Sequence, residues 1–401
     1  MDLEVSLSAD SDFDRVIVIV LDSLGCGELP DAADYGDVGA STLTHIAAAV
    51  GGLSLPNLGR WGLGNICDVQ GTPSSPRPEA AWGRMAEVSV GKDTTAGHWE
   101  LMGLPVSEAF STWPDGFSTE ILDALRKGTG RGVLGNKVAS GTAIIDELGA
   151  EHQRTGDLIV YTSADSVLQI AAHEEVVPLE ELYAACKLMR QVGDEHRIGR
   201  IIARPFLGEP GGFERTYNRH DFSLEPHGPT VLDRLVDARV PVLGIGKIKD
   251  IFAGFGVPES ISTSGNTDGI RRTQEAMERF HEGFIFVNLV DFDMLYGHRN
   301  DPEGYAKALE EFDAAVPAIK ARAQPGDLIL ITADHGNDPT FPGTDHCREY
   351  VPLLVWGPRA RALDLGVRAT FADVGATVAD VFDIAPPVVG TSLLGDIGSG
   401  S

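Results

Sequence analysis

The chain has 401 residues, of which 43% are hydrophobic. That is more than a single core usually holds, so two domains are the default expectation. A formal net charge of -27 argues against a nucleic-acid partner, because binding of a polyanion needs clustered Lys and Arg. An anionic substrate would therefore need local positive charge, from arginines or bound metal ions.

The pattern of cysteines and the start of the sequence indicate a protein of a reducing compartment. The cysteines are scattered and form no CxxC pair, so neither a disulfide framework nor a thiolate zinc site is expected. The acidic start MDLEVSLSADSDFDR lacks a secretory pattern, and no stretch approaches the roughly 20 apolar residues of a membrane span. We expect a soluble, cytoplasmic protein with no membrane partner; the sequence leaves its oligomeric state open, with a monomer as the default.

Short runs rich in Val, Ile and Leu predict β-strands. Their hydrophobicity is continuous, which is typical of strands covered on both faces in a parallel sheet flanked by helices. Segments with helical spacing lie between them, so the predicted class is α/β with a mostly parallel sheet. The predicted strands are Arg15–Leu21, Asp157–Tyr161, Val240–Ile245, Phe284–Val290, Asp327–Thr332 and Val351–Trp356, and the predicted helices are Thr42–Val50, Thr119–Lys127, Pro302–Arg322 and Phe371–Phe382.

The middle of the chain differs from the rest in its composition and pattern. Residues 108–224 begin and end with stretches that contain Pro and Gly, such as STWPDGF and LEPHGP, and hold strand-like and helix-like segments of their own. This pattern predicts an inserted α/β domain whose two crossings form a hinge. Residues 1–107 and 225–401 would then form the two parts of one catalytic core.

Three predicted strands are followed by aspartates. Asp22 follows the first, Asp291 and Asp293 follow the fourth, and Asp334 follows the fifth. Ligands of open α/β sheets bind at the carboxyl ends of the strands, so these side chains are placed to converge. Any one of them taken alone could equally cap a helix.

Histidines accompany these aspartates. Three carboxylates and three imidazoles are enough to hold two divalent ions with three protein ligands each, and the mixture suits Mn, Zn or, in part, Mg. Paired ions are a recurrent solution for phosphoryl transfer, because they clamp the attacking and leaving oxygens. A single His of this kind is more often structural. The six ligand-type residues are Asp22, Asp293, His298, Asp334, His335 and His346.

A nucleophile is offered by GKDTTAGHWE, residues Gly91 to Glu100. This segment has turn character and contains Thr94 and Thr95, while Lys92 could help to hold a phosphate. A threonine hydroxyl becomes a useful nucleophile when a metal ion lowers its pKa. From spacing alone, a helix cap formed by these Ser/Thr-like residues is a slightly better interpretation than a nucleophile.

Five blocks of this sequence resemble the phosphopentomutase family of the alkaline-phosphatase superfamily, and the resemblance extends from about Arg15 to Leu393. It departs from the family in an acidic N-terminal extension and in Thr95, a second hydroxyl beside Thr94. The blocks are VLDSLGCGELPDA, GKDTTAGHWE, YTSADSVLQIAAHEEVVP, VDFDMLYGHR and TADHGNDPTFPGTDHCREYVPLL.

The resemblance implies roles for these residues. Asp22, Asp334 and His335 would hold one Mn²⁺ ion, and Asp293, His298 and His346 would hold the second. Thr94 would carry the phosphoryl group and bridge both ions. The insertion would be a cap that contacts the pentose through Ser163 and Asp165 and a phosphate through Arg200 and Arg204.

The expected reaction interconverts ribose 1-phosphate, or its 2-deoxy analogue, with the 5-phosphate through a 1,5-bisphosphate. A sugar bisphosphate would prime the enzyme, and cap closure would exclude water. Two alternatives share the metal ligands: a phosphatase or phosphodiesterase, which releases inorganic phosphate, and the metal-dependent phosphoglycerate mutase, which has a serine nucleophile. A metal-binding or scaffolding protein without catalysis is a third alternative.

Overall fold

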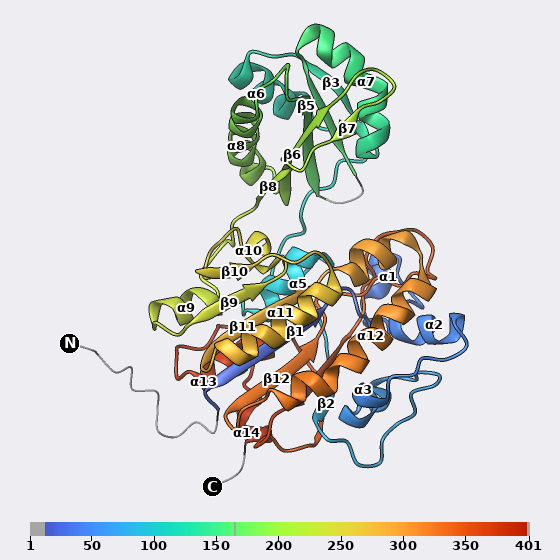
Figure 1. Cartoon of the computed structure of the whole chain (residues 1–401), viewed down its shortest axis with the longest axis vertical. Helices are drawn as coiled ribbons and strands as arrows, with labels where there is room; N and C mark the ends of the chain where they lie inside the picture. Colours follow the sequence, from blue (N-terminus) through green and yellow to red (C-terminus); the bar gives the residue numbers. More distant parts are fainter. Residues whose placement is uncertain (1–12, 164–165, 399–401) are drawn as a thin grey trace, which may run out of the picture. The chain divides into compact units, whose positions relative to one another are not determined.

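The structure, a computed structural model, describes residues 13–163 and 166–398. The chain folds into two compact units (Figure 1). The core unit comes from the two outer parts of the chain, up to Glu108 and from Pro226 onward, and the inserted unit is Ala109–Glu225. The insertion therefore begins and ends one residue later than the composition change at 108 and 224.

The core unit is built on one mixed sheet, which has eight strands among the described residues, in the order β10-β9-β11-β1-β12-β13-β2-β14. At its centre β1 pairs in parallel with β11 on one side and with β12 on the other. The carboxyl ends of these three strands therefore meet at one edge. The strands are β1 (Arg15–Leu21), β2 (Ala81–Met85), β9 (Val242–Ile245), β10 (Glu259–Ile261), β11 (Gly283–Leu289), β12 (Asp327–Thr332), β13 (Val351–Trp356) and β14 (Asp364–Arg368).

Every residue of β1, β11 and β12 is buried, as their continuous hydrophobicity predicted. The predicted bounds of β1, β12 and β13 are confirmed. The direction of β13 differs from the parallel arrangement that its apolar run suggested, because it pairs antiparallel with both β12 and β2. A continuous apolar run indicates that a strand is covered on both faces, but it does not indicate whether the strand runs parallel or antiparallel to its neighbours.

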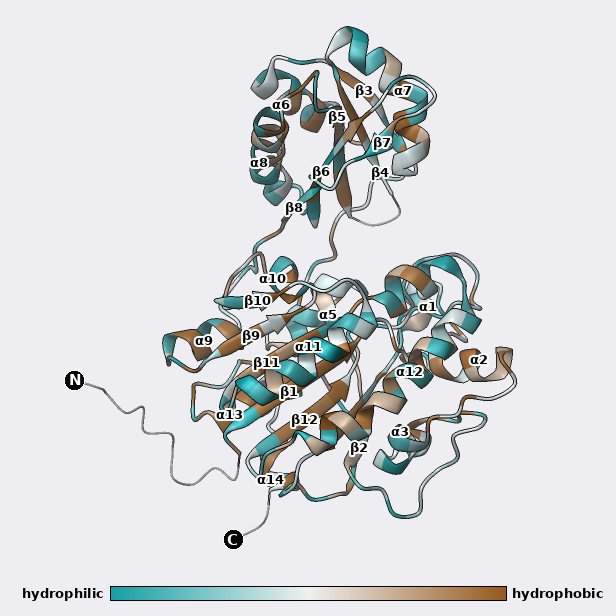
Figure 2. Ribbon diagram, viewed as in Figure 1, coloured by the Kyte–Doolittle hydropathy of each residue, from teal (hydrophilic) through white to brown (hydrophobic). Residues whose placement is uncertain are grey.

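Helices cover this sheet. Figure 1 shows α11 and α12 lying across one face, and Figure 2 shows the central strands β1 and β12 largely in brown and α11 largely in teal. The predicted helices in this unit are confirmed to within two residues at each end. The helices are α1 (Ala32–Tyr35), α2 (Thr42–Ala49), α3 (Pro56–Trp61), α4 (Leu63–Ile66), α5 (Thr94–Leu101), α9 (Val231–Asp237), α10 (Ile248–Ile251), α11 (Asn266–Arg279), α12 (Pro302–Ala321), α13 (Ala372–Val381) and α14 (Leu394–Ile397), with a π-helix, η1 (Phe292–Tyr296), and a 3-10 helix, η2 (Gly297–Arg299).

The inserted unit is an α/β domain in its own right. Its sheet runs β3-β4-β5-β6-β7, with β8 paired to β6. One face packs on α6 and α8, and the other packs on α7, so the sheet has an apolar core on each side. The elements are β3 (Val133–Val138), β4 (Leu158–Thr162), β5 (Val167–His173), β6 (Arg200–Leu207), β7 (Glu214–Arg215), β8 (His220–Ser223), α6 (Thr119–Thr129), α7 (Gly141–Thr155) and α8 (Leu179–Glu195).

None of the helices formed by residues 13–163 and 166–398 combines the length and the apolar composition that a membrane span requires.

Candidate active site

The strand ends bring the predicted ligands together at the edge of the core sheet. Asp22 directly follows β1, Asp334 follows β12, and Asp293 lies in the π-helix that follows β11. All three carboxylates are buried. Asp291 has a different role from Asp293, because its Oδ2 accepts a hydrogen bond of 2.6 Å from the backbone N–H of Asn266 at the start of α11.

Asp22, Asp334 and His335 form one ligand group, called here the β1/β12 half-site. His335 Nε2 lies 3.4 Å from Asp22 Oδ1 and 3.4 Å from Asp334 Oδ2. Neither of these two buried oxygens has a hydrogen-bond partner among the described residues. Buried carboxylate oxygens are normally satisfied, so two such oxygens that face one imidazole nitrogen fit a bound cation.

His98 lies close to the β1/β12 half-site, but it does not donate a hydrogen bond to the Asp334 carboxylate. Its Nδ1 is 3.0 Å from Asp334 Oδ2. The same nitrogen donates to the backbone carbonyl of Thr94 at 2.9 Å, one turn earlier in α5. The hydrogen bond to the carbonyl leaves the Asp334 oxygen available.

The other three predicted ligands, Asp293, His298 and His346, contact one another after β11 and are called here the β11 half-site. His298 Nε2 lies 3.1 Å from Asp293 Oδ2, and His346 Nε2 lies 3.3 Å from Asp293 Oδ1. The two Nε2 atoms are 3.2 Å apart. His298 Nδ1 contacts the carbonyl of Thr344 at 2.6 Å; a carbonyl only accepts, so Nδ1 donates and Nε2 keeps its lone pair in the neutral ring.

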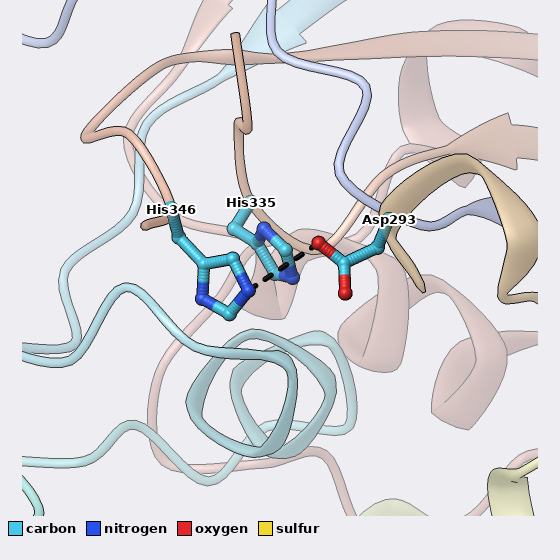
Figure 3. A group of neighbouring side chains, drawn as sticks. All are labelled: Asp293, His335 and His346. Carbon is cyan, nitrogen blue, oxygen red and sulfur yellow. Dashed lines mark ion pairs between the residues drawn. The ribbon is translucent and has the colours of Figure 1, made fainter. Parts of the chain in front are cut away.

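His335 connects the two half-sites. Its Nδ1 donates to the carbonyl of Gly336 at 3.1 Å, which directs Nε2 inward. Atoms of His335, Asp293 and His346 all lie within 4.8 Å of one another, and Figure 3 shows these three side chains pointing toward a common space. The six predicted ligands therefore form one continuous cluster.

The cluster has the electrostatic character of a cation site. Burial and then the charge of Asp334 raise the pKa of Asp22. Burial lowers the pKa of His335, but the neighbouring carboxylates of Asp334 and Asp22 outweigh this effect and hold the pKa well above its usual value. The raised pKa of His335 reflects the negative charge of the carboxylates around it, which divalent cations would neutralise.

Thr94 lies beside this cluster. Its Oγ1 is 3.2 Å from His335 Nε2. The turn predicted for residues 91–100 ends at Asp93, and the helix α5 begins at Thr94, which corrects that part of the prediction. The helix cap is Asp93, whose carboxylate accepts from the backbone N–H groups of Thr95 and Ala96, so capping does not occupy the Thr94 hydroxyl.

A glycine lets α5 approach the ligands. A Cβ at Gly97 would lie 2.0 Å from the backbone oxygen of Asp334 and 3.0 Å from the Asp334 Cβ. No side chain fits in that space, so α5 packs backbone to backbone against the segment that follows β12. The contact places Thr94 at the cluster.

Sequence reasoning missed Arg348, two residues after His346. Its buried guanidinium donates to the carbonyls of Ser89 at 2.7 Å and Gly91 at 3.1 Å, and it pairs with Glu87 at 2.7 Å. These bonds join the loop before Thr94 to the loop that carries His346. The TDHCREY block contains Arg348, but sequence alone does not give its partners.

Lys92 lies near the same loops. Its Nζ is 2.9 Å from Asp37 and 3.5 Å from Asp345. Lys92 is therefore neutralised by carboxylates in this structure.

The residues predicted to contact substrate are in the inserted unit. Ser163 follows β4, and Arg200 and Arg204 lie on β6, where Arg204 donates to Gln169 at 2.9 Å. Asp165 lies outside the described residues.

Comparison with known proteins decides the family. The Metalloenzyme superfamily model matches residues 14–386. The chain is 60% identical over 384 residues to the phosphopentomutase of Anaeromyxobacter dehalogenans, covering 96% of this chain and 98% of the relative. The chain belongs to the phosphopentomutase family. A second phosphopentomutase, from Caldanaerobacter subterraneus, is 57% identical over 386 residues, with 96% and 98% of the two chains covered.

Phosphopentomutases are isomerases, and membership in the Metalloenzyme superfamily, together with the buried ligand groups, indicates the use of divalent metal. A solved structure, that of the PH0037 protein from Pyrococcus horikoshii, shares the fold at a TM-score of 0.50 and 15% identity, with 92% and 97% of the two chains covered. The fold is the alkaline-phosphatase-like α/β fold expected from the sequence.

Proposed function

We propose that this phosphopentomutase interconverts ribose 1-phosphate, or its 2-deoxy analogue, with the 5-phosphate, and that Thr94 carries the phosphoryl group between the two positions. The supporting observation is the placement of Thr94 Oγ1, 3.2 Å from His335 Nε2. This hydroxyl lies beside the imidazole that links the two half-sites.

Each half-site would hold one divalent ion, Mn²⁺ in our proposal, and together the ions would lower the pKa of the Thr94 hydroxyl and neutralise charge on the transferring phosphoryl oxygens. The chain itself would orient the His335 ring and the Thr94 hydroxyl. The hydrogen bond from Nδ1 to Gly336 fixes the His335 ring, and α5 holds the Thr94 hydroxyl against it.

Turnover begins from phosphorylated Thr94. The free hydroxyl of a bound pentose monophosphate attacks phosphorus, the bond from phosphorus to Thr94 Oγ1 breaks, and a 1,5-bisphosphate forms. The proton lost by the sugar hydroxyl is balanced by the return of Thr94 to its alcohol form. Reversal of the same step with the other phosphate regenerates phosphorylated Thr94 and releases the isomer, and a sugar bisphosphate primes an unphosphorylated enzyme.

We assign substrate recognition to the inserted unit. Ser163 and Asp165 would contact the pentose. Arg200 and Arg204 would hold the distal phosphate, since the planar guanidinium matches phosphate oxygens bidentately. Positive charge on these arginines would attract an anionic substrate despite the acidic net charge of the chain.

The test is a side-by-side assay. Purified protein with Mn²⁺ and a trace of sugar bisphosphate is given ribose 1-phosphate, and both ribose 5-phosphate and inorganic phosphate are measured; 3-phosphoglycerate is offered separately. The proposal predicts isomer formation well above phosphate release and no reaction of 3-phosphoglycerate. Phosphate release equal to or above isomer formation would indicate a phosphatase instead.

A further inference from the structure

We propose that two buried asparagines, Asn288 and Asn337, are positioning residues that orient the two half-sites separately: Asn288 orients Asp22 in the β1/β12 half-site, and Asn337 orients Asp293 in the β11 half-site. This inference rests on the proposed two-ion site and deepens it. Both side chains are 1% exposed.

Asn288 is the polar exception in an apolar strand. It is the sixth residue of β11, GFIFVNL, where burial of an amide is costly without a partner. Its Nδ2 donates to Asp22 Oδ2 at 2.6 Å. Because a carboxylate only accepts, the amide orientation is fixed by this bond. The remaining oxygen, Asp22 Oδ1, is the buried one that faces His335 Nε2.

Asn337 contacts the carboxylate of the other half-site, at the oxygen that also lies 3.3 Å from His346 Nε2. Its Nδ2 donates to Asp293 Oδ1 at 2.9 Å and lies 3.5 Å from His298 Nδ1. A Cβ at Gly297 would lie 2.8 Å from the Asn337 amide carbon and nitrogen. The glycine therefore leaves room for Asn337 beside the π-helix that carries Asp293.

Asn337 is itself held by a chain of hydrogen bonds. Its backbone N–H donates to the carbonyl of Ser23 at 3.1 Å and to Thr42 Oγ1 at 3.1 Å. The Thr42 hydroxyl in turn donates to Glu349 Oε1 at 2.6 Å. The buried Glu349 thus holds Thr42 and, through it, the backbone of Asn337.

A carboxylate can turn about its bond to the chain, and a hydrogen bond to one oxygen limits that freedom. Such a bond also aims the lone pairs of the ligand, and the loss of this kind of support typically weakens metal binding by about 10- to 100-fold. Asn288 and Asn337 each contact one carboxylate ligand in one half-site. Loss of either asparagine should therefore weaken metal binding in one half-site and not in the other.

The experiment measures Mn²⁺ in each half-site of the full chain. Asn288→Leu and Asn337→Leu keep the approximate shape of the side chain and remove the donor. Crystals equilibrated at graded Mn²⁺ concentrations give the occupancy of each ion from anomalous diffraction. We expect Asn288→Leu to raise the half-saturating Mn²⁺ concentration of the β1/β12 half-site by about 10- to 100-fold and to leave the β11 half-site within about two-fold; Asn337→Leu should do the reverse.

Asn57→Leu is the matched control. Asn57 Nδ2 donates to Asp313 Oδ2 at 2.8 Å, an amide–carboxylate bond in the same unit, and neither residue is among the predicted ligands. This variant should have a lower melting temperature than the parent and the same Mn²⁺ occupancy in both half-sites. If a leucine variant fails to fold, Asn288→Ser or Asn337→Ser replaces it, since the shorter side chain removes the amide donor while remaining polar.

Equal weakening of both half-sites, or no weakening of either, would overturn the positioning roles. The proposed function has a separate point of failure. If the unsubstituted chain bound no Mn²⁺ pair at these ligands, the two-ion site itself would be wrong, whatever the variants showed.

Discussion

Threonine is a weak nucleophile in water, and the surroundings of Thr94 determine whether it can act as one. Its hydroxyl lies 3.2 Å from His335 Nε2, while the backbone N–H of the adjacent Thr95 serves the Asp93 cap. The Thr94 hydroxyl therefore lies against a predicted metal ligand. This placement supports our proposal that Thr94 is the phosphoryl carrier.

Thr94→Ala should lower kcat for pentose phosphate isomerisation by at least about 10³-fold, because the group that accepts the phosphoryl is gone. Thr95→Ala should stay within about ten-fold of the parent, a difference in barrier of about 1.4 kcal/mol. Steady-state kinetics and Mn²⁺ titration of both variants check this, with metal stoichiometry expected to be unchanged. Comparable loss in the two variants would reopen the choice of nucleophile.

Glu349 gives a prediction about pH. Burial raises the pKa of this carboxyl from 4.5 to about 7, although the hydrogen bonds from Thr42 and Gly27 act in the opposite direction. A raised pKa means that the fold favours the protonated acid. The contribution to stability is therefore complete below about pH 4.5 and is lost as the pH rises through about 7.

Glu349→Gln removes this titration and keeps an acceptor for Thr42. The parent should lose roughly 2.5 kcal/mol relative to the variant between pH 5 and pH 8. Chemical denaturation of both proteins at several pH values measures the difference. A difference in the free energy of unfolding that did not change with pH would show that Glu349 does not titrate in this range.

At the scale of elements, the site depends on the contact between α5 and the segment after β12. Gly97 makes that contact possible, because its missing side chain lets the helix reach the Asp334 carbonyl. Gly97→Ala should cost about 1 to 3 kcal/mol through overpacking and should weaken Mn²⁺ binding, because Asp334 must move.

Gly395→Ala provides the comparison for Gly97→Ala. Gly395 is also helical, but nothing lies within 4 Å of a Cβ placed there. Gly97→Ala should have a lower melting temperature and weaker Mn²⁺ binding than Gly395→Ala. Thermal melting and Mn²⁺ titration of the two variants measure these differences. If Gly97→Ala behaved like Gly395→Ala, the close approach of α5 would not be important to the site.

The sequence predicted the elements of the site better than their connections. Strands β1 and β12 and the Asp that follows each were predictable, because apolar runs and strand-end aspartates are local patterns. The adjacency of β11, β1 and β12 was an inference, since strand order depends on packing across the whole unit. The direction of β13 was not predictable for the same reason. The start of α5 at Thr94 follows from a local cap at Asp93, in a segment where the sequence also allowed a helix cap.

The supporting residues were harder to find than the ligands. Asn288 lies within an apolar strand, and Arg348 lies inside a block in which His346 was the evident ligand type. Their roles come from partners more than 200 residues away along the chain, such as Asp22 and Glu87. A single sequence does not identify such partners.

At the scale of the whole molecule, the six predicted metal ligands all belong to the core unit, and the inserted unit has its own two-sided core. An excised fragment of residues 109–225 should therefore unfold cooperatively on heating, as an independent domain does. It should bind no Mn²⁺, whereas the full chain should bind two ions. Calorimetry and Mn²⁺ titration of the fragment check both expectations, and a gradual, non-cooperative transition would contradict its independence.

The proposed reaction requires that Thr94 is phosphorylated during turnover. Intact-mass measurement of the protein, before and after incubation with a pentose 1,5-bisphosphate and Mn²⁺, tests it most directly. We predict a gain of one phosphoryl group, located at Thr94 by peptide mapping and absent in Thr94→Ala. No gain in mass, or a phosphoryl group on a different residue, would show that Thr94 is not the phosphoryl carrier.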